Sequence, residues 1–236
     1  MRMKFIYSLM FLLFELVSFG QKTINNDSIG DINFNIKHYE EAISDYSKAL
    51  LLDTNSFMTF YKRGNAEYEL HQYKEALTDY TKAAELNPKF ANAFNNRGNA
   101  KRNLKDYYGA IKDASKAIEL DSTFSMAYNN RGISKRYLGD YEGSLKDHLK
   151  AIELNPSDPM PYTNIGNIKS ILKDYDNAIK FYNKAIELNP NDGMAYSNRG
   201  RAFFLKNENS KACSDFSRAF ELGITLASKM IDLYCK

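Results

Sequence analysis

The chain has 236 residues, 44% of them apolar, and its 32 basic and 29 acidic residues leave a formal net charge of +3. A charge so close to balance gives no electrostatic basis for binding nucleic acid over the surface as a whole. A local basic band occurs at residues 101–102 and 135–136, but aromatic side chains do not alternate with it to stack on bases. The sequence therefore predicts no nucleic-acid partner.

Residues 1–20 have the composition of an export signal. A short basic start is followed by an apolar run over residues 5–13, and small residues precede Gln21. This order is typical of a secretory signal peptide, and we expect cleavage before Gln21. The rival interpretation is a retained membrane anchor. The run is shorter than the ~18 residues that a membrane span needs, and Glu15 would cost ~2.5 to 3.5 kcal/mol near the bilayer centre. We therefore expect an exported protein, periplasmic or secreted, with no membrane insertion after cleavage.

From residue 57 onward one pattern returns every 34 residues. Its constant features are an aromatic residue, a glycine four residues later and a small residue twelve further on: Phe60, Phe94, Tyr128, Tyr162 and Tyr196; Gly64, Gly98, Gly132, Gly166 and Gly200; Ala76, Ala110, Ser144, Ala178 and Ala212. A fixed period of about 20 to 50 residues is the signature of a solenoid, in which each unit buries its apolar face only against its neighbours.

Each unit contains two amphipathic helices. In the unit that begins at residue 91, apolar and small residues recur at helical spacing over 91–104 and again over 107–120, with a short turn between them. Asn-Pro pairs at 87–88, 155–156 and 189–190 end helices, because proline lacks an amide donor and disfavours a helical residue before it. We name the two helices of a repeat helix A and helix B.

In these positions the chain resembles tetratricopeptide-repeat (TPR) proteins of the exported bacterial type. The resemblance implies an all-α fold, an alpha-alpha superhelix with five clear repeats, one weaker N-terminal repeat and a C-terminal capping helix. We expect the weaker repeat at 23–56, the clear repeats at 57–90, 91–124, 125–158, 159–192 and 193–226, and the capping helix at 225–235. Repeat positions are counted below from the first residue of each repeat.

Two positions change together within the chain. Position 7 is arginine and position 23 is aspartate in four clear repeats, and the repeat that has Ile165 at position 7 has Phe181 at position 23. We infer that these residues touch and join helix A to helix B, by an ion pair in four repeats and an apolar contact in the other. The weak repeat, with Ile29 and Asp45, breaks this rule.

The remaining face of helix A is rich in asparagine, although asparagine is an indifferent helix former. A carboxamide offers two donors and an acceptor and can pair with a peptide unit whatever its side chain. In the family that the chain resembles, helix A lines the concave wall, and position 6 resembles the asparagine ladder by which some members hold a peptide backbone. The predicted peptide-binding residues are Asn65, Asn96, Asn99, Asn130, Asn164, Asn167, Asn198, Arg102, Arg136 and Arg201. Lys62 departs from the ladder, and the excess of cations near the face suggests a mildly acidic or polar ligand. The alternative is a solvated face in a chain rich in asparagine and lysine throughout.

No motif for catalysis, metal binding or a cofactor is present. His38, His71 and His148 fall on different elements of different repeats, and no phosphate-binding glycine loop or nucleophile elbow occurs. We expect a non-enzymatic scaffold, without metal or cofactor, that binds an extended peptide or partner protein in its groove. The competing expectation is a structural protein that self-associates or docks to a cell-envelope complex through terminal or convex surfaces. Cys213 and Cys235 are either a disulfide that attaches the terminal helix to the last repeat or two reduced thiols.

Overall fold

The computed structural model describes residues 26–235, and all regular secondary structure within them is helical. The all-α prediction is confirmed. The predicted signal peptide, residues 1–20, lies outside the described residues. Within residues 26–235 no helix has both the length and the apolar composition that crossing a membrane requires.

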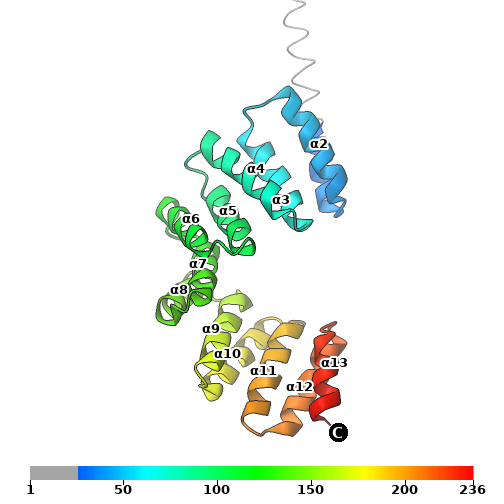
Figure 1. Cartoon of the computed structure of the whole chain (residues 1–236), viewed down its shortest axis with the longest axis vertical. Helices are drawn as coiled ribbons and strands as arrows, with labels where there is room; N and C mark the ends of the chain where they lie inside the picture. The colour runs from blue at the N-terminus through cyan, green and yellow to red at the C-terminus, as the bar shows by residue number, and fades with distance from the viewer. Residues whose placement is uncertain (1–25, 236) are drawn as a thin grey trace, which may run out of the picture. The chain divides into compact units, whose positions relative to one another are not determined.

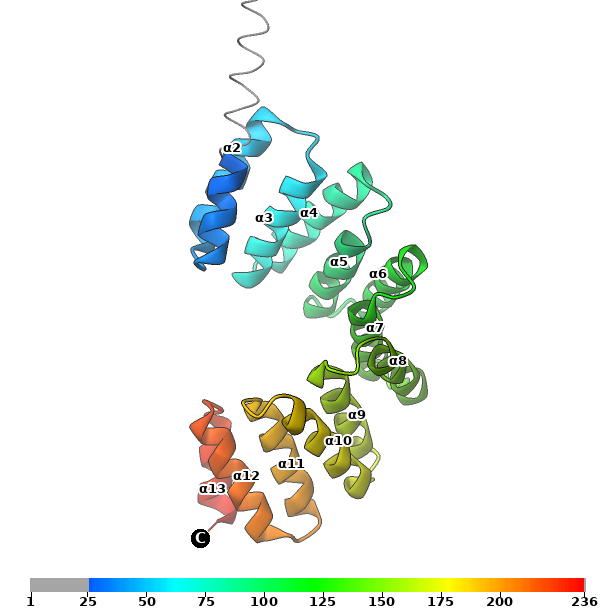
Figure 2. The same ribbon diagram turned by 180° about the vertical axis from the view of Figure 1, so that it is seen from behind.

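The chain divides into two compact units, Met1–Asp121 and Ser122–Lys236. The described part of the first unit contains the helical residues 26–35 followed by α2 (Tyr39–Leu52), α3 (Phe57–Glu69), α4 (Tyr73–Leu86), α5 (Ala91–Asn103) and α6 (Tyr107–Leu120). The second contains α7 (Ser125–Tyr137), α8 (Tyr141–Leu154), α9 (Pro159–Ile171), α10 (Tyr175–Leu188), α11 (Gly193–Leu205), α12 (Asn209–Glu221) and α13 (Leu226–Tyr234). Within each unit, consecutive helices lie side by side and pack against one another (Figure 1; Figure 2). Odd-numbered helices from α3 to α11 are helix A of a repeat, and the even-numbered ones are helix B.

The turn from helix A to helix B has one conformation in every repeat. Position 15 has a positive φ each time, at Lys37, His71, Lys105, Gly139, Lys173 and Asn207. Only Gly139 adopts this left-handed region without steric cost. Aspartate at the next position caps the following helix in three repeats; the Asp106 and Asp140 carboxylates, for example, accept from the amides of Gly109 and Gly143 at 2.9 Å.

The glycine at position 8 allows the two helices of a repeat to approach closely. A Cβ added at Gly166 would lie 2.5 Å from Cε1 of Tyr182, the position-24 ring of helix B, which is almost fully buried. The small residues around it, such as Ala178 and Ala202, are buried in the same core cluster. Glycine is required here by contact between the helices, since its backbone is ordinary helix.

The inferred contact between positions 7 and 23 is confirmed in all four repeats. Each arginine donates two hydrogen bonds to its aspartate; in the pair Arg97–Asp113, Nε lies 2.8 Å from Oδ2 and Nη2 lies 2.6 Å from Oδ1. The other pairs have the same geometry: Arg63–Asp79, Arg131–Asp147 and Arg199–Asp215. In the weak repeat Asn33, at position 11, donates to Asp45 at 2.8 Å in place of the missing arginine.

Position 11 adds a second partner for this aspartate in some repeats. Lys101 lies 2.7 Å from Asp113, and Lys135 lies 2.8 Å from Asp147. These lysines therefore belong to the helix pair rather than to the exposed basic band that the sequence suggested. In the first clear repeat position 11 is Glu67, where burial, and then the neighbouring Asp79, raises the carboxyl pKa to about 8.

Candidate functional site

The predicted peptide-binding residues all lie on helix A of their repeats. In the first unit Asn65 lies on α3, and Asn96, Asn99 and Arg102 lie on α5; in the second unit Asn130 and Arg136 lie on α7, Asn164 and Asn167 on α9, and Asn198 and Arg201 on α11. Their hydrogen bonds distinguish them. Several join neighbouring repeats, whereas Asn99, Arg136 and Arg201 have polar atoms without a hydrogen-bond partner among the described residues.

A three-residue hydrogen-bond chain links α4, α3 and α5 in the first unit. The hydroxyl of Tyr80, at position 24, donates to Oδ1 of Asn65 at 2.8 Å, and Nδ2 of Asn96 donates to the same oxygen at 2.9 Å. Asn96 Nδ2 also donates to the hydroxyl of Tyr61 at 3.0 Å. The position-6 carboxamide is thus held against the preceding repeat by its amide group.

The same chain recurs in the second unit between α10, α9 and α11. Tyr182 donates to Asn167 Oδ1 at 2.8 Å, and Asn198 Nδ2 donates to that oxygen at 3.0 Å. Positions 24, 9 and 6 therefore form one repeated element, in which a buried tyrosine and the next repeat share a carboxamide oxygen. Each of these asparagines fixes the packing of adjacent repeats.

His148 replaces the tyrosine where position 9 is apolar. Ile133 offers no acceptor, and His148 Nδ1 shares a 3.0 Å hydrogen bond with Asn129 Oδ1, to which Asn164 Nδ2 also donates at 3.0 Å. Burial lowers the pKa of His148 to about 4, so the ring is neutral at physiological pH, and its Nε2 has no partner among the described residues. His148 therefore has a structural role in the packing of these helices.

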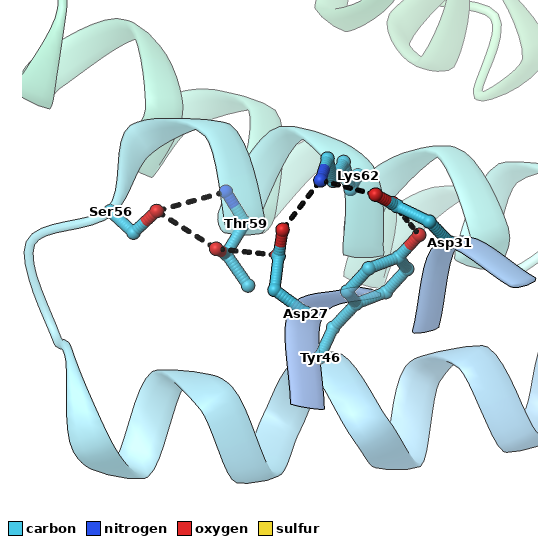
Figure 3. A network of polar contacts seen from close by, with 6 residues as sticks. All are labelled: Asp27, Asp31, Tyr46, Ser56, Thr59 and Lys62. Atoms are coloured by element: carbon cyan, nitrogen blue, oxygen red, sulfur yellow. Dashed lines mark hydrogen bonds and ion pairs between the residues drawn. The ribbon is translucent and has the colours of Figure 1, made fainter. Parts of the chain in front are cut away.

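Lys62, the exception to the asparagine series, is held by the N-terminal repeat. Its ammonium group lies 2.5 Å from Asp27 and 2.8 Å from Asp31, both on the helical residues 26–35 (Figure 3). Asp31 also accepts from the Tyr46 hydroxyl at 2.8 Å, so positions 24, 9 and 6 have the same arrangement here with charged groups. Lys62 is therefore not one of the cations available to a ligand, which corrects the sequence interpretation.

A hollow of ≈ 270 Å³ opens on the helix A face of the first unit. It is lined by Phe34, Asn65, Tyr68, Glu69, Tyr80, Asn96 and Asn99. Asn99 occupies position 9, but Ala114 at position 24 of its repeat has no hydroxyl group to donate, and Asn99 Oδ1 is buried with no partner among residues 26–235. An unpaired buried carbonyl oxygen is the kind of atom that a ligand N–H satisfies.

A second hollow, of ≈ 390 Å³, lies on the helix A face of the second unit. Its lining is Asn167, Ser170, Ile171, Lys173, Tyr175, Tyr182, Asn198, Arg201 and Leu205. Arg201 has position 9 in the last repeat, where Phe216 replaces the tyrosine of position 24. Its exposed guanidinium group has neither a hydrogen bond nor an ion pair with any described residue. Asn99 and Arg201 are therefore the polar position-9 residues left out of the hydrogen-bond chains.

The other predicted residues are more enclosed. Asn130 is buried and Arg102 is half-buried, and each has an interaction with another residue. The Arg136 guanidinium lies 4.5 Å from the ring centroid of Tyr137, and its Nε is buried with no partner within the described part of the chain. Sequence reasoning missed Lys173 and Leu205, which line the second hollow; both stand at or just after the end of helix A, beyond the asparagine stripe.

The side chains at these sites are suited to binding rather than to bond making. Across residues 26–235 no cluster of three or more histidine, cysteine, aspartate or glutamate residues has an arrangement that could hold a metal ion. What the hollows present is carboxamides, tyrosine rings and an unpaired guanidinium group on rigid helices. Such groups donate to and accept from backbone amides and carboxylates.

The repeat pattern is matched by models of a known family. Models of the tetratricopeptide repeat match residues 27–56, 64–105, 91–124, 125–158, 160–192 and 181–213. The chain is a tetratricopeptide-repeat protein. Repeats of this family form scaffolds for protein–protein interaction. None of the curated proteins searched matches the sequence.

Solved structures share this architecture. MamA is 26% identical, with 68% of this chain and 94% of that one covered and a TM-score of 0.61. PilF of Pseudomonas aeruginosa is 17% identical over 92% of this chain and 99% of its own, with a TM-score of 0.75. YrrB, described as a TPR protein with an unusual peptide-binding site, is 20% identical over 79% and 97%, with a TM-score of 0.56. The last two likenesses concern the fold alone.

Proposed function

We propose that this protein is an exported, non-enzymatic scaffold that holds an extended polypeptide against the helix A faces of its repeats. The proposal rests on which side chains at position 9 have hydrogen-bond partners. Asn65 and Asn167 have their oxygens occupied by hydrogen bonds between repeats, whereas Asn99 and Arg201 line the hollows and have polar atoms without a hydrogen-bond partner among the described residues. A polypeptide backbone supplies the N–H groups and carbonyls that such side chains bind.

The hydrogen-bond chains make the rest of the surface suitable for this role. Because Asn96 and Asn198 are held by their amide groups on neighbouring repeats, their orientation is fixed before a ligand arrives. A site whose groups are already ordered loses less conformational entropy on binding. The asparagines that link the repeats thus support the binding face as well as the fold.

Export is part of the proposal. The signal-like residues 1–20 motivate it, and the disulfide between Cys213 and Cys235 agrees with it, because such bonds persist in oxidising compartments. Export would be tested by the N-terminal sequence of the protein recovered from its native cells, which should start at Gln21. Recovery of the uncleaved chain from the cytosol would contradict this part.

The binding proposal is tested with peptides selected from a random displayed library on the full chain. Asn99→Ala removes no intramolecular hydrogen bond within the described residues, so we expect the affinity for a selected peptide to fall by about tenfold with unchanged thermal stability. Asn209→Ala, on the first turn of helix B of the last repeat, is the matched control and should keep both properties. Unchanged affinity in the Asn99→Ala variant would contradict the proposal.

A role in assembly through the ends of the chain is the second candidate. Leu226 and Leu233 on the terminal helix α13 are 62% and 69% exposed, and exposed apolar groups at a solenoid end can mediate contact with another subunit. Sedimentation over a range of concentrations tests this: association lost in Leu233→Ser but kept in Asn99→Ala would favour assembly over peptide binding.

A further inference from the structure

A third hollow, of ≈ 470 Å³, lies between helix A of the last repeat and the terminal helix. Its lining includes Asn198, Arg201, Phe204 and Leu205 of α11 and Met230 and Tyr234 of α13. Most of these side chains are apolar, in contrast to the carboxamide-rich hollow next to it. The two hollows share Asn198, Arg201 and Leu205.

The terminal helix α13 supplies one wall of this hollow and is held in place covalently. Cys213 on α12 is bonded to Cys235, the residue after α13. The preceding residue, Tyr234, lies against Phe204 of α11 with ring centroids 4.1 Å apart. α13 packs along α12 at the C-terminal end of the chain (Figure 1; Figure 2). The shape of the hollow therefore depends on the disulfide.

The charges around the hollow have one sign. Arg201 borders both hollows, and Lys173 lines the neighbouring one; neither forms an ion pair with a described residue. No carboxylate is among the residues that line either hollow. A guanidinium group beside an apolar surface binds a carboxylate through paired, charge-assisted hydrogen bonds.

We propose that this hollow binds a segment of a partner polypeptide in which a large apolar side chain stands next to a carboxylate. The apolar side chain fills the space between α11 and α13, and the carboxylate pairs with Arg201. This inference rests on the proposed peptide-binding function. It adds selection of side chains, which the helix A asparagines do not provide if they bind the peptide backbone. The carboxylate can belong to an acidic side chain or to the C-terminus of the partner polypeptide, and the experiment below distinguishes the two.

The test uses three labelled glycine-serine peptides and fluorescence anisotropy with the full, oxidised chain. The first has an internal Phe-Asp and an amidated end, the second ends in phenylalanine with a free carboxylate, and the third has an internal Phe-Asn and an amidated end. We expect the first or the second to bind at least about tenfold more tightly than the third. Which of the two binds identifies the carboxylate as a side chain or a terminus. Equal affinity for all three would overturn the proposal.

Variants localise the site. Arg201→Gln should remove the advantage of the acidic peptide, whereas Lys229→Gln, which removes the same charge from α13 outside the hollow lining, should keep it. Exchange of Cys213 and Cys235 together for serine should weaken binding of the acidic peptide by about tenfold, because it frees the wall of the hollow. Full affinity in either the Arg201→Gln variant or the serine variant contradicts the proposal. Asn99 lies in the other unit. Loss of library-peptide binding in Asn99→Ala, together with equal affinity of the wild-type chain for all three glycine-serine peptides, would therefore refute this inference and leave the proposed function standing.

Discussion

Removal of one arginine from the ion pairs between helix A and helix B should cost very different amounts in different repeats. Among residues 26–235, Arg199 is the only cation that pairs with Asp215, at 2.8 and 2.7 Å. Asp113 has Arg97 at similar distances and also Lys101 at 2.7 Å. Truncation of Arg199 therefore leaves a carboxylate without a cation, whereas truncation of Arg97 does not.

The expected costs follow from burial. The side chain of Asp215 is 7% exposed and that of Arg199 is 18% exposed, so the pair is largely desolvated. Removal of one member of a buried pair costs about 3 to 5 kcal/mol, and the partial exposure of Arg199 places this pair near the lower end, at about 3 kcal/mol. For Arg97→Ala we expect about 1 to 2 kcal/mol, because Lys101 still neutralises Asp113.

The repeat before Arg199 suggests a double substitution that restores the lost stability. Ile165 and Phe181 occupy the same two positions in the preceding repeat, and Ile165 is 1% exposed. Arg199→Ile with Asp215→Phe should therefore recover most of the stability that Arg199→Ala loses. The assay is urea unfolding followed by circular dichroism, with hydrogen exchange of the last repeat to detect its separate unfolding. Equal destabilisation by Arg97→Ala and Arg199→Ala would show that Lys101 does not compensate for the loss of Arg97.

Three further predictions concern the histidine, the turns and the disulfide. His148 has a pKa of about 4 when folded and an ordinary value of 6.5 when unfolded. Its contribution to stability is therefore present above pH 6.5 and is lost as the pH falls towards 4, a loss on the order of 3 kcal/mol. Melting curves recorded between pH 4 and pH 7 should show this loss in the wild-type chain and not in His148→Phe. Lys105→Gly should stabilise by up to about 1 kcal/mol, because its φ is positive, whereas a drop in melting temperature would show that the turn is unstrained. Reduction of the Cys213–Cys235 disulfide should lower the unfolding free energy measured by calorimetry by about 2 to 4 kcal/mol. The control is the variant with both cysteines exchanged for serine, and a smaller loss on reduction than in that variant would contradict a stabilising role of the covalent bond.

Much of the fold was predictable because the same 34-residue pattern is repeated several times in the sequence. Five glycines in one register and the shared change at positions 7 and 23 predicted the helical repeat and the arginine–aspartate contacts without any relative for comparison. A single repeat would not have shown that Ile165 and Phe181 vary together. The internal repetition replaced the information that an alignment usually supplies.

The site was less predictable because its hydrogen bonds combine three positions on two repeats. The Tyr182–Asn167–Asn198 chain involves helix B and helix A of one repeat and helix A of the next. Sequence reasoning counted the asparagines as one exposed stripe and did not distinguish those that link repeats. The signal was present: position 24 lacks a hydroxyl group where position 9 is Asn99 or Arg201, and these are the two polar position-9 side chains left without a hydrogen-bond partner in the described chain.

The two ends of the chain were the hardest to interpret. The repeat at 23–56 matched the pattern weakly, so the carboxylates of residues 26–35 that hold Lys62 were not expected. α13 lies beyond the last repeat and has no counterpart inside the chain with which its sequence could be compared. Contacts between unlike elements carry no internal repetition, and for that reason the hollow beside α13 is visible only in the structure.

We propose that the polar residues at position 9 divide into those that join repeats and those that meet a ligand. The direct test measures the unfolding free energy and the affinity for one library-selected peptide in four alanine variants, at Asn65, Asn99, Asn167 and Arg201. We expect Asn65→Ala and Asn167→Ala to lose about 1 to 3 kcal/mol of stability, because each leaves a buried tyrosine hydroxyl unpaired. Asn99→Ala and Arg201→Ala should stay within about 0.5 kcal/mol and lose about tenfold or more in affinity. Stability lost at Asn99 and Arg201 with affinity retained would contradict the account.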